Sequence, residues 1–588
     1  MSDHDSAGEA QEYSPPVKPA DAREWTMRGI IVALLVAAVI GASYPYIVLK
    51  LGFGPNIAVV SAFFGYLLLA LFAGRTALRF ESNLAQAAGT IAGQTAFMCT
   101  IMAAFDMLMI DKVAGFESAM TPWQIFSWLT TAGMLGVFLA VPMRRHFVVD
   151  EKLPYADGLA AGEALIVLDA RGAEAKNAII SLILGMVSSA GVAFLFMRAF
   201  IHEEIVVRIN RFSNVTHTGF STSLLMIGSG MIIGLRICAN MFVGLILAWV
   251  IAPVLLADAG IIAETATKRD ILLWVMWPAT GMMIAGGLTA LVLKWRVLSK
   301  SFKSLTGARV DSGDMPMRHV LIGIVLSGIG VVLVQKLELG MPIGLTLLAL
   351  LFTIPLMLVG LRVLGETNWG PISALSNLMQ AVFGVVSPGN IPANMAASGL
   401  TGTIVADSEG LMQSYRTGHL IGSTPRYLTY IQLMAVPVGA LMVAIMYPIL
   451  RENFGFTGDN ALSSPISQKW VGFAKLLGLG LDALHPSAFA ALGIAVVLGV
   501  VFTVLEQFKS IKRWVPSPTG IGIGMLVPAT AVATMFIGAV IDVVWRSVDK
   551  KSPDSKILPL ASGFIAGEAV IVVVLSILYA TKVLHLPG

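Results

Sequence analysis

The sequence is poor in charged residues and in cysteine. Of its 588 residues 13% are charged, against about 25% in soluble domains, and 56% are hydrophobic. Its two cysteines, Cys99 and Cys238, both fall in apolar runs. They exclude a disulfide framework and a thiolate metal cluster, and small buried side chains are the expected role. The net charge of +4 is too small and too dispersed for a nucleic-acid-binding protein.

Two enzyme motifs are missing as well. His202-Glu203-Glu204 has no second histidine four residues after the first, so the helix of zinc proteases is absent. The phosphate-binding loop Gly-x-x-x-x-Gly-Lys-[Ser/Thr] does not occur, which argues against direct drive by ATP. We therefore expect a protein that is not an enzyme and that has no cofactor and no resident metal.

Long apolar runs fill the chain, and their length predicts an all-α polytopic membrane protein with about sixteen transmembrane helices in two repeated halves. The runs 154–168 and 395–412 are short enough to be re-entrant, and the run 222–256 is long enough to contain a break near Gly230-Met-Ile-Ile-Gly234. The expected spans are 29–49, 56–74, 84–105, 123–143, 154–168, 178–200, 222–256, 271–293, 319–335, 343–361, 371–388, 395–412, 427–449, 486–507, 520–545 and 558–581.

The polar residues 1–26 predict a disordered cytoplasmic tail without the features of a signal peptide. With all sixteen segments spanning, the connections on the side of this tail hold more lysine and arginine than the others. By the positive-inside rule, both termini of this multi-pass protein are expected in the cytoplasm, and the membrane is expected to be the cell (inner) membrane.

Short words recur at nearly one offset along the chain. Lys50-Leu51…Gly54…Ile57 matches Lys336-Leu337…Gly340…Ile343, and Ala279-Thr-Gly281 matches Ala561-Ser-Gly563. The matches predict two membrane halves, residues 27–310 and 311–588. Eight spans in each half would make them parallel, related by an axis along the membrane normal. Internal repeats are typical of transporters, whose substrate sites lie where the repeats meet.

Two similar helices each carry one carboxylate: Gly158-Leu-Ala-Ala-Gly162-Glu163 and Gly563-Phe-Ile-Ala-Gly567-Glu568. Glycines four residues apart lie on one face and allow close helix packing. An ionised carboxylate at the bilayer centre costs roughly 2.5–3.5 kcal/mol, so Glu163 and Glu568 should face the protein interior or water. A chance match between small-residue helices is the alternative. A true relation would imply a smaller, inverted unit within each half.

Other polar residues interrupt apolar runs. An acid and an amide begin two of them, Glu81 with Asn83 and Glu366 with Asn368, where they can cap a helix or coordinate a polar ligand. Arg236 lies inside an apolar run, with Asn240 one turn later. A guanidinium in such a place needs an anionic partner, either a carboxylate such as Glu163 or Glu568 or an anionic ligand. A structural salt bridge is equally consistent.

Two further regions combine polar residues with helix breakers. Pro388-Gly389-Asn390-Ile391-Pro392 cannot continue a helix; Asn390 fits an ordinary loop, whereas Asn394 should lie deeper. The stretch 407–426 holds two acids, Gln413, a tyrosine, two arginines and a histidine, and is either a solvated loop or packed structure. His485, before Pro486, is either a proton relay or an interfacial residue.

Several words resemble the oligopeptide transporter family, which includes the yellow stripe-like metal-chelate transporters. The resemblance runs from about Glu24 to the end of the chain. The words, in order, are Lys152-Leu-Pro-Tyr-Ala-Asp-Gly158, Gly234-Leu-Arg-Ile237, Gly365-Glu-Thr-Asn-Trp-Gly-Pro-Ile-Ser373, Leu411-Met-Gln…Thr417-Gly-His-Leu-Ile-Gly-Ser-Thr-Pro-Arg426 and Gly563-Phe-Ile-Ala-Gly-Glu568.

This resemblance implies about sixteen spans and cation-coupled uptake, usually with protons, of small peptides or metal chelates. The Lys-Ile-Pro-Pro-Arg word of the peptide-transporting eukaryotic branch is absent, and only a Pro-Gly remains near Pro388. Both departures place the chain nearer the prokaryotic or metal-chelate members. Family members often carry acids near Leu411-Met-Gln413, where this chain has Gly410 and Ser414.

We therefore expect a secondary active transporter, coupled to protons, that imports small peptides, peptide-like molecules or metal chelates. A membrane-embedded enzyme and a passive channel are the alternatives. Partners are the substrate, protons and the lipid bilayer, and a homo-oligomer is compatible with the many small-residue helix faces. The candidate substrate- or ion-binding residues are Glu163, Glu568, Arg236, Asn240, Glu366, Asn368, Asn394 and Gln413.

Overall fold

The computed structural model describes residues 23–580, except 52–56, 74–78, 170–172, 199, 294–312, 368–369, 457–460, 480–485, 509, 512–513 and 549–552, and it also describes residue 583. Most of the predicted tail, Asn368, His485 and most of the basic connection after residue 293 lie outside the described residues. The side chain of Glu366 lies outside them too.

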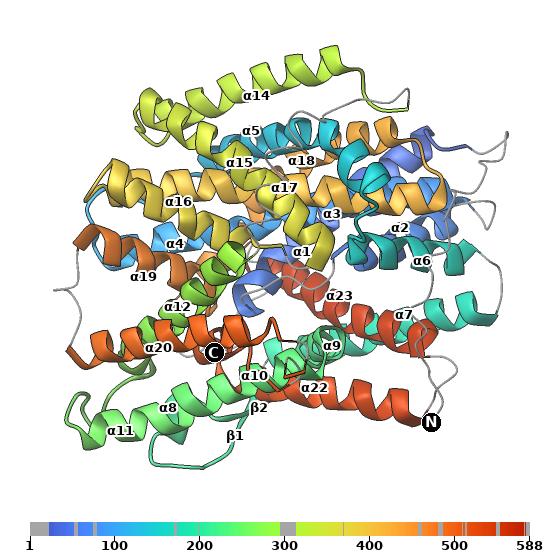
Figure 1. The fold of residues 1–588 in the computed structure, drawn as a ribbon. Helices are drawn as coiled ribbons and strands as arrows, with labels where there is room; N and C mark the ends of the chain where they lie inside the picture. Colours follow the sequence, from blue (N-terminus) through green and yellow to red (C-terminus); the bar gives the residue numbers. More distant parts are fainter. Residues whose placement is uncertain are drawn as a thin grey trace.

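The described chain is almost entirely helical, as predicted, and Figure 1 shows two groups of helices, one above the other. The upper group, bundle A, contains α1 (Met27–Leu51), α2 (Ile57–Ala73), α3 (Arg79–Phe97), α4 (Cys99–Ile110), α5 (Pro122–Ala140), η1 (Val141–Met143), η2 (Arg145–Asp150), α6 (Ala156–Asp169), α14 (Met317–Leu337), α15 (Ile343–Thr367), α16 (Ile372–Val386), α17 (Ile391–Ile421), α18 (Pro425–Phe454) and α19 (Pro465–Leu479).

The lower group, bundle B, also holds a small antiparallel hairpin in which Ile205 pairs with Phe220. Its elements are α7 (Ala173–Met197), β1 (Glu204–Val206), α8 (Ser213–Thr216), β2 (Gly219–Ser221), α9 (Leu224–Ile233), α10 (Leu235–Leu245), η3 (Ile246–Ile251), α11 (Ala252–Asp258), α12 (Lys268–Leu293), α20 (Pro486–Leu505), α21 (Pro518–Leu526), α22 (Ala529–Val548) and α23 (Pro553–Ala580).

Eleven helices of the described part are long and apolar enough to cross a membrane. Several expected spans differ in extent. Helix α6 has 14 residues, about 21 Å, which is shorter than a bilayer's hydrocarbon core. Helix α19 was not predicted, because Lys469 and Lys475 interrupt its apolar pattern. The predicted break at Gly234 is confirmed by its positive φ of 87°.

Helix α17 is the buried axis of bundle A. Its 31 residues run to Ile421, beyond the predicted end at 412, and nearly all are buried. It lies antiparallel to α3, because Gly410 faces Gln94 whereas Gly418 faces Asn83. The region 407–421 is therefore packed helix and not a solvated loop. Small residues allow the two backbones to approach closely.

Two broken segments of bundle B are related by a local two-fold. The first, α9–α10, breaks at Gly234; the second, α21–α22, breaks at Val527-Pro528, within the single span expected for 520–545. Gly230 lies against the carbonyl of Met535, and Gly524 against that of Met241. The shift in residue number that relates Gly230 to Gly524 also relates Met241 to Met535, so the two contacts are equivalent.

Further contacts follow the same two-fold. Gly244 faces the carbonyl of Ile521, and Gly538 that of Ile227. Phe242 stacks on Phe536, its mate under the same shift, with ring centroids 4.9 Å apart. The α12 and α23 words matched in the sequence, at Ala279 and Ala561, pack on Gly522 and Gly228 respectively. These related segments lie in different predicted halves; the relation of the two whole halves stays a prediction.

Candidate functional site

Helix α23 lies between the two bundles in Figure 1 and carries the fully buried carboxylate of Glu568. Ser223, the N-cap of α9, donates its hydroxyl to both carboxylate oxygens at 2.9 and 2.7 Å. The backbone N–H of Leu225, in the first turn of α9, donates to Oε2 at 3.2 Å. The start of a helix stabilises negative charge through such free N–H groups, so α9 forms a carboxylate-binding end.

Helix α1 supplies a cation to the same site. Lys50 Nζ lies 3.5 Å from Glu568 Oε1 and 2.5 Å from Glu203 Oε1. It also donates to the hydroxyl of Tyr46 at 2.7 Å, and that hydroxyl lies 3.5 Å from Glu568 Oε1. The lysine side chain is 16% exposed and the Glu203 side chain 35%, so the cluster runs from the interior to an accessible edge. It joins bundle A to bundle B.

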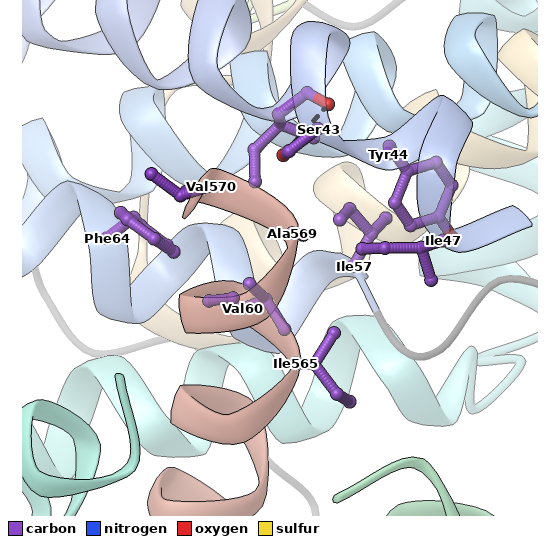
Figure 2. A pocket seen from close by; sticks show the side chains of 11 residues that line it. Ser43, Tyr44, Ile47, Ile57, Val60, Phe64, Ile565, Ala569 and Val570 are labelled. Carbon is purple, nitrogen blue, oxygen red and sulfur yellow. Dashed lines mark hydrogen bonds between the residues drawn. The ribbon is translucent and has the colours of Figure 1, made fainter. Parts of the chain in front are cut away.

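A small apolar cleft adjoins this cluster between α1, α2 and α23. Figure 2 shows Tyr44, Ile47, Ile57, Val60 and Ile565 around it. Ala569 and Val570, the residues directly after Glu568, also line it. Its free space is about that of one water molecule. The described conformation is therefore closed at this point of contact between the bundles.

Bundle A holds a second set of buried carboxylates, which the sequence did not single out as site residues. Asp407 accepts the hydroxyl of Thr95 at 3.1 Å on both oxygens. Glu409 lies beside Gly360 and Gly370, and its Oε1 has no hydrogen-bond partner among the described residues. The available signal was the small-residue spacing of α17 at Gly399, Gly402 and Gly410, which is typical of a buried helix and not of a loop.

Glu163 does not face the protein interior, which was one of the two environments expected for it. Gly158 and Gly162 do pack closely on α17, against Gln413 and Leu420, as their spacing predicted. Glu163 lies on another side of α6, where its side chain is exposed. The resemblance between the Glu163 and Glu568 helices is thus one of glycine packing. The environment of the carboxylate differs, because α9 and α1 enclose only Glu568.

The predicted partners of Arg236 are wrong. Its guanidinium donates to Glu506 at 2.6 Å and is 45% exposed, so it meets neither Glu163 nor Glu568. Asn240 accepts the N–H of Ser517 at 2.9 Å and donates to the carbonyl of Arg236 at 2.7 Å. These bonds join α10 to the start of α21, which favours the structural salt bridge.

The remaining candidates are divided. Asn390 is exposed and caps α17 by accepting the N–H of Ala393, whereas Asn394 is buried and donates to the carbonyl of Gln380 at 2.6 Å. Within the part of the chain that the structure describes, the Oδ1 atom of Asn394 has no hydrogen-bond partner. Gln413 is also buried. Neither residue lies in the Glu568 cluster, and both stay candidates.

The acid and amide at the start of α3, Glu81 and Asn83, have structural partners. The Arg28 Nε–H is shared between the two Glu81 oxygens at 2.9 and 3.1 Å, Arg28 Nη2 donates to Oε2 at 2.8 Å, and Thr26 donates its hydroxyl to Oε1. The amide of Asn83 donates to Ser423 at 2.9 Å. These contacts join the starts of α1 and α3 and the end of α17, so this turn holds bundle A together.

The hairpin after α7 is held by charge at its base. Glu204 binds His217 Nδ1 at 2.5 Å and accepts the hydroxyl of Thr530 at 2.7 Å. Burial raises the pKa of Glu204, but the hydrogen bonds from His217 and Thr530 and the charge of Lys268 outweigh it, so the net pKa is lowered. Adjacent residues of this segment thus bind different helices: Glu203 reaches α1, and Glu204 reaches α22.

Comparison with known families gives the class of protein. The family model described as OPT oligopeptide transporter protein matches residues 24–579. The chain belongs to the oligopeptide transporter family. The match spans both bundles, so the whole described architecture is that of a transporter family member.

Relatives of this transporter extend over nearly the same length. It is 23% identical to a putative oligopeptide transporter of Haemophilus influenzae, over 92% of this chain and 93% of the relative. It is 19% identical to the putative oligopeptide transporter YGL114W of Saccharomyces cerevisiae, over 86% and 88%. It is 22% identical to the probable metal-nicotianamine transporter YSL5 of rice, over 96% and 95%.

Proposed function

We propose that this protein is a proton-coupled secondary active transporter that imports small peptides, peptide-like molecules or metal chelates. Glu568 is the carboxylate that takes up and releases the coupled proton. Alternating access comes from movement of bundle A against bundle B around the site where α1 meets α23 and α9. Both termini lie in the cytoplasm, and the membrane is the cell membrane.

The observation that carries this proposal is the buried cluster of Lys50, Glu203 and Glu568 between the bundles. A carboxylate that is enclosed at a moving interface can change its charge only when the interface opens to water. Intramembrane ionisable residues are typically part of ion or proton pathways. The small cleft beside Glu568 lies at the same interface, where a substrate would enter once the bundles separate.

The substrate class rests on the relatives. Two are named oligopeptide transporters, and another is named a metal-nicotianamine transporter. Both kinds of molecule carry carboxylate and amine groups. Asn394 and Gln413, both on α17, remain candidates for binding them, as do Glu366 and Asn368.

The test is uptake into proteoliposomes that contain the purified full-length protein, under an imposed pH gradient. The probes are di- to hexapeptides and iron and nickel chelates of nicotianamine. We expect saturable accumulation of one class, and its collapse on adding a protonophore. Downhill flux without accumulation would support the passive channel instead. Chemical conversion of a probe in detergent would support the membrane-embedded enzyme.

A further inference from the structure

The connection between α7 and β1 contributes a charge to the site that the transport proposal leaves unused. Glu203 lies one residue before β1, and its carboxylate forms the shortest contact of Lys50. Its backbone carbonyl accepts the N–H of Thr222 at 2.8 Å, directly before the Ser223 cap of α9. Glu203 is thereby fixed to the same helix start that binds Glu568.

Counted over the described residues, the cluster holds one cation, Lys50, for two carboxylates, Glu203 and Glu568. The charged and titratable groups that reach Glu568 are Lys50 and Tyr46 from α1 and Glu203 from the connection after α7. The described start of helix α9 adds no charged side chain; it contributes the Ser223 hydroxyl, the Leu225 N–H and the partial positive charge of a helix start. With both acids ionised the cluster carries one net negative charge. Uncompensated charge in a low-dielectric interior is costly, and one bound proton removes it.

The geometry indicates which acid holds that proton. Lys50 lies 1 Å closer to Glu203 than to Glu568, at 2.5 against 3.5 Å. Glu203 is also partly open to solvent, whereas Glu568 is fully enclosed. An ion pair at Glu203 and a neutral carboxyl at Glu568 therefore place each group where its charge costs least. The two Lys50 distances in the closed structure match this arrangement.

We propose that Glu203 is a positioning residue of the coupling site, which holds Lys50 while Glu568 is protonated and releases it when Glu568 ionises. The inference rests on the proposed function and deepens it. When the interface opens, Glu568 loses its proton to water and Lys50 moves to the new carboxylate. Because Lys50 belongs to α1 and Glu203 to bundle B, this exchange shifts α1 against the hairpin.

The first consequence concerns the charge balance. In Glu203→Gln the cluster has one cation and one carboxylate, so it is neutral without a bound proton. Lys50 then pairs with an ionised Glu568. The site no longer needs its proton at neutral pH, although Glu568 itself is still present. Glu203→Asp keeps the charge, and it should restore proton binding.

The experiment is infrared difference spectroscopy of the full-length protein in lipid, without substrate, between neutral and alkaline pH. We expect a protonated-carboxyl band in the wild type that is lost in Glu568→Gln and reduced at least fivefold in Glu203→Gln. Glu203→Asp should regain it. Glu506→Gln, which removes the partner of Arg236, is the matched control and should leave the band unchanged.

A band in Glu203→Gln equal to that of the wild type would overturn the inference. So would absence of the band in wild-type protein that elutes as a folded species from size-exclusion chromatography. Because this readout needs no substrate, it separates the two proposals. A normal band pattern together with no uptake of any probe would count against the transport proposal while leaving the shared proton intact.

Discussion

The starts of α9 and α21 are equivalent under the local two-fold, and they differ in one respect that matters chemically. Each helix begins at a serine N-cap, Ser223 or Ser517, whose hydroxyl accepts an N–H of the first turn. The helix packed on each start is α23 or α12. At the matching position α23 has Glu568, whereas α12 has Gly286 against Pro518. The starts of α9 and α21 are thus packed in the same way, but among the described residues an ionisable side chain, that of Glu568, lies only at the start of α9.

This difference indicates that helix packing in the repeated segments and proton binding depend on different residues. The framework depends on glycines at helix crossings, which occur in both copies. The chemistry depends on a single carboxylate and on Lys50 from bundle A. Substitution of the glycines at helix crossings should therefore have the same effect on stability in both copies. Substitution of the residues that bind the proton should have an effect in one copy.

The largest effect is expected at the helix crossings. At Gly230 an added Cβ would lie 1.9 Å from the carbonyl of Met535, and at Gly524 2.0 Å from that of Met241. Gly230→Leu and Gly524→Leu should each destabilise the protein by about 3 kcal/mol, because backbone must move. Thermal unfolding in detergent measures this. Gly191→Leu in α7, where an added Cβ meets nothing within 4 Å, is the control.

Unequal losses at the two glycines would contradict the two-fold. If Gly524→Leu were tolerated while Gly230→Leu was not, the two crossings would not be structurally equivalent. A loss as large in Gly191→Leu would mean that the effect comes from helix propensity or lipid contact and not from the crossing.

The two serine caps give the next effect. Ser223→Ala and Ser517→Ala should each cost about 1 kcal/mol, the usual value of an N-cap. Only Ser223→Ala should also change the pH dependence of uptake, because the Ser223 hydroxyl donates to the carboxylate of Glu568. Thermal stability and uptake are measured on the same preparations. An equal change in pH dependence for Ser517→Ala would remove the functional difference between the two helix starts.

The hairpin gives a smaller, pH-dependent effect. The pKa of Glu204 is lowered, so its stabilising contribution is complete above the ordinary value of about 4.5 and is lost only as pH falls through the lower folded-state value. The Ser221 N–H, which donates to Thr534 at 2.7 Å, should stay protected from hydrogen exchange down to below that pH. Loss of this protection near neutral pH would contradict the prediction; Glu204→Gln is the comparison variant.

The smallest effects are expected at exposed charges. Arg236→Ala breaks an ion pair whose partners are 45% and 25% exposed, which should cost less than about 1 kcal/mol. It should leave proton-driven uptake unchanged. Thermal stability and uptake rates check both statements. A loss of coupling in this variant would return Arg236 to the set of transport residues.

Much of the fold could be predicted from the sequence, because apolar length and glycine are local signals. The break at Gly234 and the helical character of the runs follow from residues near each feature. Helix α19 was not predicted because its two lysines interrupt the apolar pattern of its sequence. The end of α17 was placed too early because Asp407 and Glu409 are charged residues of a kind that usually lies in a solvated loop. In the structure α3 and neighbouring helices cover both side chains.

The site itself could be predicted only in part. Glu163 and Glu568 occur in nearly the same word, and local sequence does not tell which one the rest of the chain encloses. The partners Lys50, Ser223 and Glu203 come from three distant segments and have ordinary local settings. Their roles depend on tertiary packing between the bundles, which no spacing in the sequence encodes.

Proton-driven uptake by Glu568→Gln, compared with Glu163→Gln, tests the central claim most directly. The wild type and Glu163→Gln should accumulate the transported probe under an imposed pH gradient to the same level. Glu568→Gln should lose this accumulation at least tenfold while still exchanging labelled for unlabelled probe without a gradient. Full gradient-driven accumulation by Glu568→Gln would contradict the account, because the coupled proton would then be bound elsewhere.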